Sequence, residues 1–292
     1  MNEEVRGRRP LSRRNDPSYD TLFESVPAWL QPSLWAWVTM VLQYPGTSGY
    51  SVVDESKLHE LERRLRIEFD WTRGAGNVLD QLKLMMRNDK AGRFALDVVD
   101  MLLADMPVTS YRDRLKELEQ SLKESGSAWT VVVRGDIGGL EQRVDPTVAG
   151  AAAKVIEESG RAGALLSDAW RAVYGRSPNA SSGYRDAVRA VEAAGKPIIS
   201  PNNPSTTLGT IIRDIEAAPQ KWTLRLSPAG SVDPMGTLLN MIKLLWKAQF
   251  DRHGTPDENV PINLSIEEAE TALHLATTLV QWFVGGAVRR VT

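Results

Sequence analysis

The chain contains no cysteine among its 292 residues. This absence excludes disulfide bonds, thiolate nucleophiles and cysteine-based zinc sites, and it is typical of a protein of the reducing cytoplasm. Histidine is also scarce. His59, His253 and His274 are far apart and lack the paired spacing of metal ligands, so the sequence predicts no metal site.

Long hydrophobic runs and a strong net charge are missing as well. No apolar stretch reaches the ~20 residues that span a bilayer, and residues 1–14 lack the apolar segment of a secretory signal. The formal net charge is −2, so the overall charge balance does not require nucleic acid or an anionic membrane as a partner. We therefore expect a cytoplasmic protein that does not associate with membranes.

The N-terminus departs from this balance, because residues 1–14 carry five arginines against two glutamates. We expect residues 1–20 to form a disordered basic tail, with a nucleic-acid-binding arm as the alternative. The whole chain is 42% hydrophobic, which is enough for two cores. Residues 21–145 are expected to form a mostly helical domain with short strands near 129–144, and residues 146–292 a helical bundle. The predicted fold class is mainly α.

Helical spacing of apolar residues, together with cap signals, gives the expected elements. In the first domain, helices are expected after Pro32, after caps at Asp54 and Asn77, over 94–103, and over 111–123 behind a Ser110–Asp113 capping box. Residues 129–134 predict a strand, which the turn 136–139 connects to a partner over 140–144. In the second domain the expected helices are 147–158, 161–174, 182–194, 206–217, 234–250 and 265–285, and the proline-rich residues 196–205 predict a loop.

Several residues have more than one interpretation. The glycine-rich run from Arg134 to Gly139 fits a hairpin turn better than a phosphate-binding loop, because it lacks the required glycine and lysine spacing. Glu192 fits a surface or ion-paired residue, with a site carboxylate as the alternative. His59 is expected to be a solvated surface residue and His274 a packed helix residue. No motif indicates a cofactor.

The corner Arg252-His253-Gly254 follows the long helix expected over 234–250. Basic residues near a helix C-terminus interact with its last carbonyl groups, and glycine is the usual left-handed cap, so helix capping accounts for this pattern. A catalytic or RNA-contacting role for Arg252 and His253 is the alternative, with Lys247 as a further RNA-binding cation. Contact with a protein partner is a third possibility.

The order of features in the second half is similar to that of a known protein family. The features are those of residues 165–175, Pro178, residues 187–192, 207–209 and 251–254, and Ala269 and Ala272. Together they resemble the C-terminal domain of bacterial abortive-infection (phage-exclusion) proteins, which is similar to the HEPN superfamily. The resemblance covers roughly residues 160–285 and implies a helical bundle, often dimeric, used in phage defence.

Many HEPN proteins are metal-independent RNases in which an arginine precedes a histidine by four to six residues. In this chain the positions with four to six residues between them and His253 hold Ala248, Lys247 and Trp246, and the only arginine is the adjacent Arg252. The resemblance thus implies an antiphage protein, prophage-encoded or bacterial, that binds or cuts RNA through Arg252 and His253. The alternative is a non-catalytic protein whose degenerate bundle forms a homodimer or binds a phage or host protein.

Overall fold

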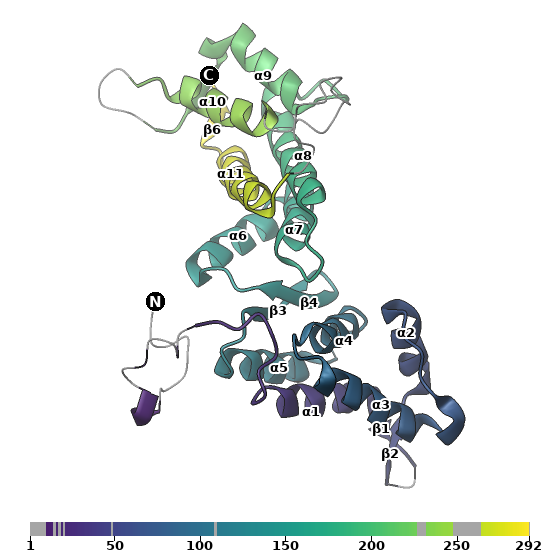
Figure 1. Cartoon of the computed structure of the whole chain (residues 1–292). Coiled ribbons are helices and arrows are strands. Elements are labelled where there is room, and N and C mark those ends of the chain that lie inside the picture. The colour runs from purple at the N-terminus through teal and green to yellow at the C-terminus, as the bar shows by residue number, and fades with distance from the viewer. Residues whose placement is uncertain are drawn as a thin grey trace, which may run out of the picture. The chain divides into compact units, whose positions relative to one another are not determined.

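The computed structural model describes residues 10–13, 16, 19, 21–47, 49–107, 110–226, 232–247 and 264–291. The chain divides into two compact units, Met1–Arg143 and Val144–Thr292, each with its own hydrophobic core (Figure 1). The described residues form eleven α-helices and three two-stranded antiparallel sheets, which confirms the prediction of a mainly α protein. Most of the predicted basic tail lies outside the described residues, and within it Leu11–Arg13 form a short 3-10 turn.

The first unit consists of five helices, a β-hairpin that packs on α4 and α5, and a short two-stranded ribbon. Its elements are α1 (Gln31–Leu42), β1 (Gln43–Pro45), β2 (Ser51–Val53), α2 (Glu55–Leu65), α3 (Ala75–Asn88), α4 (Arg93–Ala104), α5 (Arg112–Glu124), β3 (Trp129–Arg134) and β4 (Ile137–Gln142). Apolar residues at helical spacing, among them Leu58, Leu82 and Leu118, are buried and form the core.

Helices cover both edges of the β3–β4 hairpin. The Asp100 carboxylate of α4 accepts a hydrogen bond from the Leu140 N–H at 2.7 Å, and the Glu119 carboxylate of α5 accepts one from the Val131 N–H at 2.8 Å. Exposed strand edges invite pairing with other chains, and here side-chain oxygens occupy the outward-facing donors. Arg134 and Glu141 form a largely buried two-point ion pair on the same hairpin.

The hairpin also corrects two boundaries. Gly138 and Gly139 were expected in the turn, but they lie in β4, and the turn consists of Gly135 and Asp136. Gly135 has a φ of +62°, a conformation that glycine adopts without strain. A Cβ on Gly138 would lie 2.8 Å from the carbonyl oxygen of Leu103. The glycine is therefore required by the close approach of α4 to the strand, and the hairpin-turn interpretation of this run holds with a shorter turn.

The second unit is a helical bundle with one short ribbon. Its elements are α6 (Pro146–Glu158), α7 (Gly160–Tyr174), α8 (Ala180–Ile199), α9 (Leu208–Ala217), β5 (Trp222–Leu224), α10 (Pro234–Lys247), α11 (Ile266–Val284) and β6 (Val288–Arg290). Helix α8 packs against both α7 and α11, and β5 pairs with β6. The predicted caps at Asp145 and Ser265 are confirmed, Ser265 as a full capping box with Glu268.

Other local predictions were wrong. Helix α8 continues through Pro197 to Ile199, because Ile199 is buried and Gly195 packs against Ile211 and Phe283. The burial of these residues offsets the loss of the backbone hydrogen bond that a proline cannot donate.

Three further differences concern ends and short strands. Helix α3 begins at Ala75, two residues before the expected cap at Asn77, and α5 begins without a side-chain cap from Ser110. The β1–β2 and β5–β6 ribbons were not predicted. The last residues of the helix expected over 234–250 lie outside the described residues.

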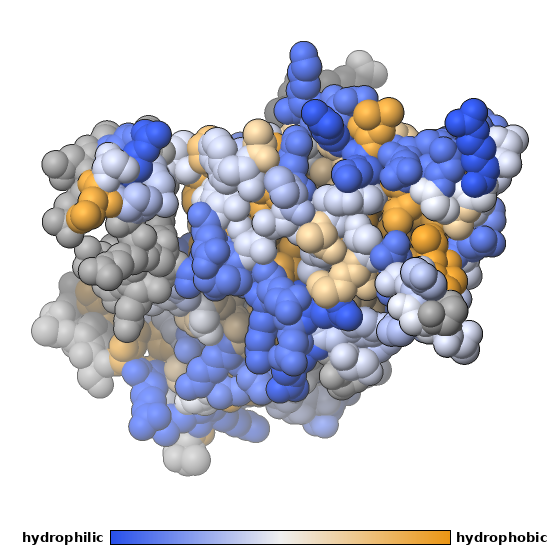
Figure 2. Space-filling view, turned by 90° about the horizontal axis from the view of Figure 1, so that it is seen from below, coloured by the Kyte–Doolittle hydropathy of each residue, from blue (hydrophilic) through white to orange (hydrophobic). Residues whose placement is uncertain are grey.

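Most of the described surface in Figure 2 is hydrophilic, and hydrophobic residues appear on that face in separate patches. Among the exposed apolar side chains of the first unit are Tyr44, Tyr50 and Val52 of the β1–β2 ribbon, with exposures of 51%, 78% and 40%. Tyr44 and Val52 are cross-strand partners and therefore share one face of the ribbon.

None of the helices in the described ranges combines the length and hydrophobicity needed to cross a membrane.

Candidate functional site

The residues that the sequence singles out for chemistry lie at the edge of the described structure or outside it. Lys247 is the last described residue of α10, and Arg252 and His253 fall within 248–263, outside the described residues. The helices that flank this segment are described. The buried Tyr184 hydroxyl of α8 donates to the Leu245 carbonyl oxygen at 2.7 Å, which ties the end of α10 to the first turns of α8.

A cluster of polar side chains lies on α7 and α11. The Tyr174 hydroxyl oxygen is 2.7 Å from Oε1 of Glu270 and 2.8 Å from Nε2 of His274. Glu270 and His274 are four residues apart on α11, so their side chains share one face of that helix. Tyr174 is the last residue of α7, and α8 begins six residues after it, at Ala180. The cluster therefore lies at the end of the bundle where α7 turns into α8.

Local sequence explains why Tyr174 is held there. Asn179 caps α8 by accepting a hydrogen bond from the Ser182 N–H. Gly183 then lets α8 approach α7 closely, since a Cβ at this position would lie 2.7 Å from a methyl group of Val173. On the other side, the Ser265 capping box fixes the start of α11 one turn before Glu270. The phenol is thereby held between two anchored helix ends.

The hydrogen bonds of the cluster determine which atoms carry the protons. A phenol has one hydrogen to donate, whereas an ionised carboxylate can only accept. Tyr174 therefore donates to Glu270, and the Nε2–H of His274 donates to the phenol oxygen. In a neutral imidazole this arrangement leaves the lone pair on Nδ1. Glu270, acting through Tyr174, thus selects the tautomer of His274 in the way that a carboxylate bonded directly to a histidine does.

The electrostatics of the cluster keep the phenol protonated. Burial raises the pKa of Tyr174 well above its ordinary value, and the hydrogen bond to the Glu270 carboxylate and its negative charge raise this pKa further. Tyr174 consequently acts as a fixed hydrogen-bond donor and not as a base. Tyr174 is only 4% exposed to solvent, whereas the side chains of His274 and Glu270 are 36% and 43% exposed. Two of the three groups can therefore meet a ligand from solvent.

The indole of Trp170 completes the surroundings of His274. Its ring lies 5.9 Å from the imidazole centroid in an edge-to-face arrangement and 4.9 Å from the Tyr174 ring. Trp170 is one turn before Tyr174 on α7 and is buried. This packing restricts the rotation of the imidazole, which corrects the prediction that His274 is simply a packed residue: it is a partly exposed, hydrogen-bonded group on a buried aromatic support.

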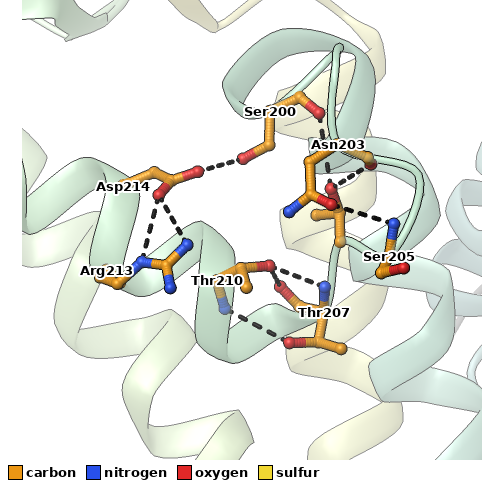
Figure 3. A network of polar contacts seen from close by, with 8 residues as sticks. Ser200, Asn203, Ser205, Thr207, Thr210, Arg213 and Asp214 are labelled. Atoms are coloured by element: carbon orange, nitrogen blue, oxygen red, sulfur yellow. Dashed lines mark hydrogen bonds and ion pairs between the residues drawn. The ribbon is translucent and has the colours of Figure 1, made fainter.

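A second polar network joins the end of α8 to the start of α9, and it is structural (Figure 3). The Ser200 hydroxyl donates to Asp214 at 2.5 Å, and Thr207 and Thr210 form a reciprocal cap. Glu192 accepts a hydrogen bond from the Leu208 N–H, also at the start of α9. The carboxylates of Asp214 and Glu192 thus accept hydrogen bonds from donors within the protein. Glu192 is a helix-capping partner here, neither a free surface residue nor part of the His274 cluster.

The remaining histidine of the described chain has a structural partner. His59 stacks on Trp71 with ring centroids 4.0 Å apart, and its Nδ1 lies 3.0 Å from Glu62. Glu62 also accepts hydrogen bonds from the Phe69 N–H and the Trp71 indole. These hydrogen bonds lower the pKa of Glu62 even though its burial acts in the opposite direction. His59 is at the surface as predicted, and it helps to hold residues 66–73 against α2.

Sequence reasoning missed Tyr174 and Glu270. The four-residue spacing of Glu270 and His274 on a well-capped helix shows that they share a face, and this signal was readable. Their contact with Tyr174 joins residues about a hundred positions apart and follows only from the packing of α7 on α11. Within the described ranges, no group of three or more histidine, aspartate or glutamate side chains gathers as metal ligands would.

Comparison with known proteins finds no matching family model, no matching curated protein and no matching solved structure.

Proposed function

We propose that this chain is an antiphage protein of the abortive-infection kind whose C-terminal helical unit cuts RNA without a metal ion. The observation that supports this proposal is the Tyr174–Glu270–His274 cluster. It provides a histidine of defined tautomer, partly exposed, on the helix that follows the Arg252-His253 segment. The order of sequence features that resembles abortive-infection proteins spans the same helices.

Metal-independent RNA cleavage requires two proton transfers. The 2′-oxygen attacks the adjacent phosphorus while its proton passes to a base. The bond from phosphorus to the 5′-oxygen then breaks, and an acid protonates the leaving oxygen, which gives a 2′,3′-cyclic phosphate and a 5′-hydroxyl end. Histidine suits both roles near neutral pH. We assign one role to His274 through Nδ1 and the other to His253, with Arg252 and Lys247 as cations that neutralise the developing negative charge.

The test is cleavage of bulk tRNA by the purified full chain in EDTA. We expect His253→Ala and His274→Ala each to lower the rate strongly, since general acid–base catalysis contributes typically ~100-fold or more. Tyr174→Phe and Glu270→Gln should reduce the rate less and change its pH profile, because they release the tautomer of His274 without removing the imidazole.

His59→Ala is the matched control, since it removes a partly exposed histidine that belongs to the first unit. Cleavage that is unchanged in the His274→Ala and His253→Ala variants, or that requires a metal ion, would refute the proposal. Mass analysis of the products provides a second criterion, because cyclic phosphate ends distinguish this chemistry from hydrolysis.

A second candidate is a non-catalytic protein that forms a homodimer or binds a phage or host protein. Two observations favour it: no arginine occupies the expected spacing before His253, and the β1–β2 ribbon of the first unit exposes Tyr44, Tyr50 and Val52. In that case purified protein leaves RNA intact. Light scattering then reports a dimer, or Tyr50→Ser together with Val52→Ser abolishes capture of a phage protein that the wild type retains.

A further inference from the structure

The β5–β6 ribbon carries an unusual concentration of positive charge. Lys221, Arg225, Arg289 and Arg290 are all exposed. In the sequence, residues 217–232 and 271–292 contain no aspartate or glutamate, so these four residues and His274 are the only ionisable side chains in the two stretches. The second unit as a whole has equal numbers of acidic and basic residues, since Val144–Thr292 contains 15 of each. The ribbon is therefore a local basic surface within a neutral unit.

Pairing of the two strands brings three of these cations together. Backbone hydrogen bonds join Arg225 to Ala287 at 2.7 Å and Val291 to Lys221 at 2.8 Å. Thr223 pairs with Arg289 between them. Side chains alternate along a strand, so Thr223 and its partner Arg289 lie on the face opposite Trp222, Leu224 and Val288. Lys221 and Arg225 directly flank β5, and the two backbone hydrogen bonds hold them beside β6. Lys221, Arg289 and Arg225 therefore lie close together along the ribbon.

The opposite face anchors the ribbon to the bundle. Trp222, Leu224 and Val288 are buried among the helices, and β5 contacts α10 while β6 contacts α8 and α11. Figure 1 shows β6 running directly from the end of α11. The three cations are consequently held on or beside an anchored strand pair, and Arg289, opposite Thr223, is offset by two residues, about 7 Å along the strand direction, from each of Lys221 and Arg225. This spacing is comparable to that of neighbouring phosphates along a nucleic acid strand.

Nearby carboxylates are already engaged. Glu216 at the end of α9 forms an ion pair with Lys243 at 2.6 Å. Asp233 accepts a hydrogen bond from the Met235 N–H at the start of α10. Within the described part of the chain, no ion pair is formed by Lys221, Arg225, Arg289 or Arg290. Four exposed cations that have no counterion among the described residues form a surface that an external polyanion can neutralise.

We propose that the β5–β6 ribbon binds the phosphate backbone of a single-stranded nucleic acid. Cations placed along a groove or ribbon contact phosphates without reading the base sequence, and the binding energy comes from release of counterions. His274 lies ten residues before the end of α11 at Val284, about 15 Å along the helix axis at 1.5 Å per residue, and β6 begins after that end. This surface is therefore distinct from the Tyr174–Glu270–His274 cluster, and its binding does not require the cleavage proposed above.

The test uses a labelled single-stranded DNA of about 20 nucleotides, which covers the usual site sizes. DNA lacks the 2′-hydroxyl and cannot undergo the proposed cleavage, so binding is measured separately from that function. Fluorescence anisotropy gives the affinity of the full chain over a range of salt concentrations. The test variant is Lys221→Gln/Arg225→Gln/Arg289→Gln. The control is Lys154→Gln/Arg161→Gln/Arg171→Gln, which removes the same charge from exposed positions on α6 and α7.

Each lost phosphate contact lowers the slope of log affinity against log salt concentration by about 0.7, so the slope of the test variant should be smaller by about 2. When salt is lowered from 1 M to 0.1 M, the test variant should therefore gain roughly 100-fold less affinity than the wild type. The control variant should retain the wild-type slope, as should Arg225→Lys/Arg289→Lys, and RNA of the same sequence should bind with similar affinity. The inference is overturned if the wild type does not bind DNA, or if both triple variants weaken binding equally. It is also overturned if the test variant unfolds and the charge-preserving variant Arg225→Lys/Arg289→Lys already has a reduced salt dependence of binding. Binding to anionic lipid vesicles without binding to DNA would also overturn it.

Discussion

Replacing Tyr174 by phenylalanine tests the protonation scheme on which the candidate site depends. The substitution removes one hydroxyl and with it the 2.7 Å hydrogen bond to Glu270 and the 2.8 Å hydrogen bond to His274. A hydrogen bond to a charged group contributes about 1.5–3 kcal/mol, but Glu270 and His274 are partly exposed and regain water, so we expect a loss of about 1–2 kcal/mol near neutral pH.

The dependence of this loss on pH is the sharper part of the prediction. The pKa of Tyr174 is raised in the folded state, so the phenol stabilises the fold fully below the unfolded-state pKa. Above about pH 10 the unfolded chain releases the phenol proton and the folded chain keeps it, so stability falls by about 1.4 kcal/mol per pH unit. The difference between wild type and Tyr174→Phe should therefore shrink to near zero at about pH 11.

The measurement is urea-induced unfolding of both proteins at neutral and alkaline pH, followed by circular dichroism. Tyr50→Phe is the control for the substitution itself, since this phenol is 78% exposed. If the wild type and Tyr174→Phe differ by the same free energy at both pH values, the phenol is not held between the carboxylate and the imidazole, and the tautomer assigned to His274 loses its basis.

Three further predictions concern stability. Gly138→Ala should cost about 1–3 kcal/mol in thermal or urea unfolding, because the new Cβ would lie 2.8 Å from the Leu103 carbonyl oxygen. The matched Gly150→Ala, whose Cβ meets nothing within 4 Å in α6, should instead stabilise by about 0.5–1 kcal/mol; equal effects would refute the packing argument. Glu141→Ala should cost about 3–5 kcal/mol by removing the carboxylate that binds the largely buried Arg134 at two points, and a double-mutant cycle with Arg134→Ala should show strong coupling; additive losses would contradict the pair. Glu62→Gln should destabilise the chain at neutral pH and less at acidic pH, because the pKa of Glu62 is lowered in the folded state and its contribution is lost as pH falls through that value; a gap that stays constant between neutral and acidic pH would count against it.

The contrast between Ser265 and Ser110 shows which local signals are sufficient. Both precede an acidic residue by three positions, and only Ser265 forms the capping box. Behind Ser265, α11 has apolar residues at helical spacing over nineteen positions, so the helix start is well determined. Helix α5 begins at Arg112 with Tyr111 as its N-cap, and Leu115, Leu118 and Leu122 anchor it in the core. Packing therefore sets the start of α5 without the cap.

The positions of the short strands followed from contacts that local patterns do not contain. β4 begins at Ile137 because Gly138 fits against the backbone of α4, and β5 forms because β6, more than sixty residues later, pairs with it. The alternation in 222–226 is too short to identify a strand without that partner. Pro197 led to the opposite error, a loop predicted where the helix continues. Burial of Ile199 extends α8 past a residue that usually ends a helix.

The sequence by itself determined the mainly helical class, most helix positions and the charge pattern of the β5–β6 ribbon, because apolar spacing, caps and charge counts are local properties. Only the tertiary structure decided that the hydroxyl of Tyr174 on α7 contacts both Glu270 and His274 of α11, and that Lys221, Arg289 and Arg225 lie together on the β5–β6 ribbon. Both arrangements depend on distant segments meeting in one register, and that register is set by the burial of their apolar sides.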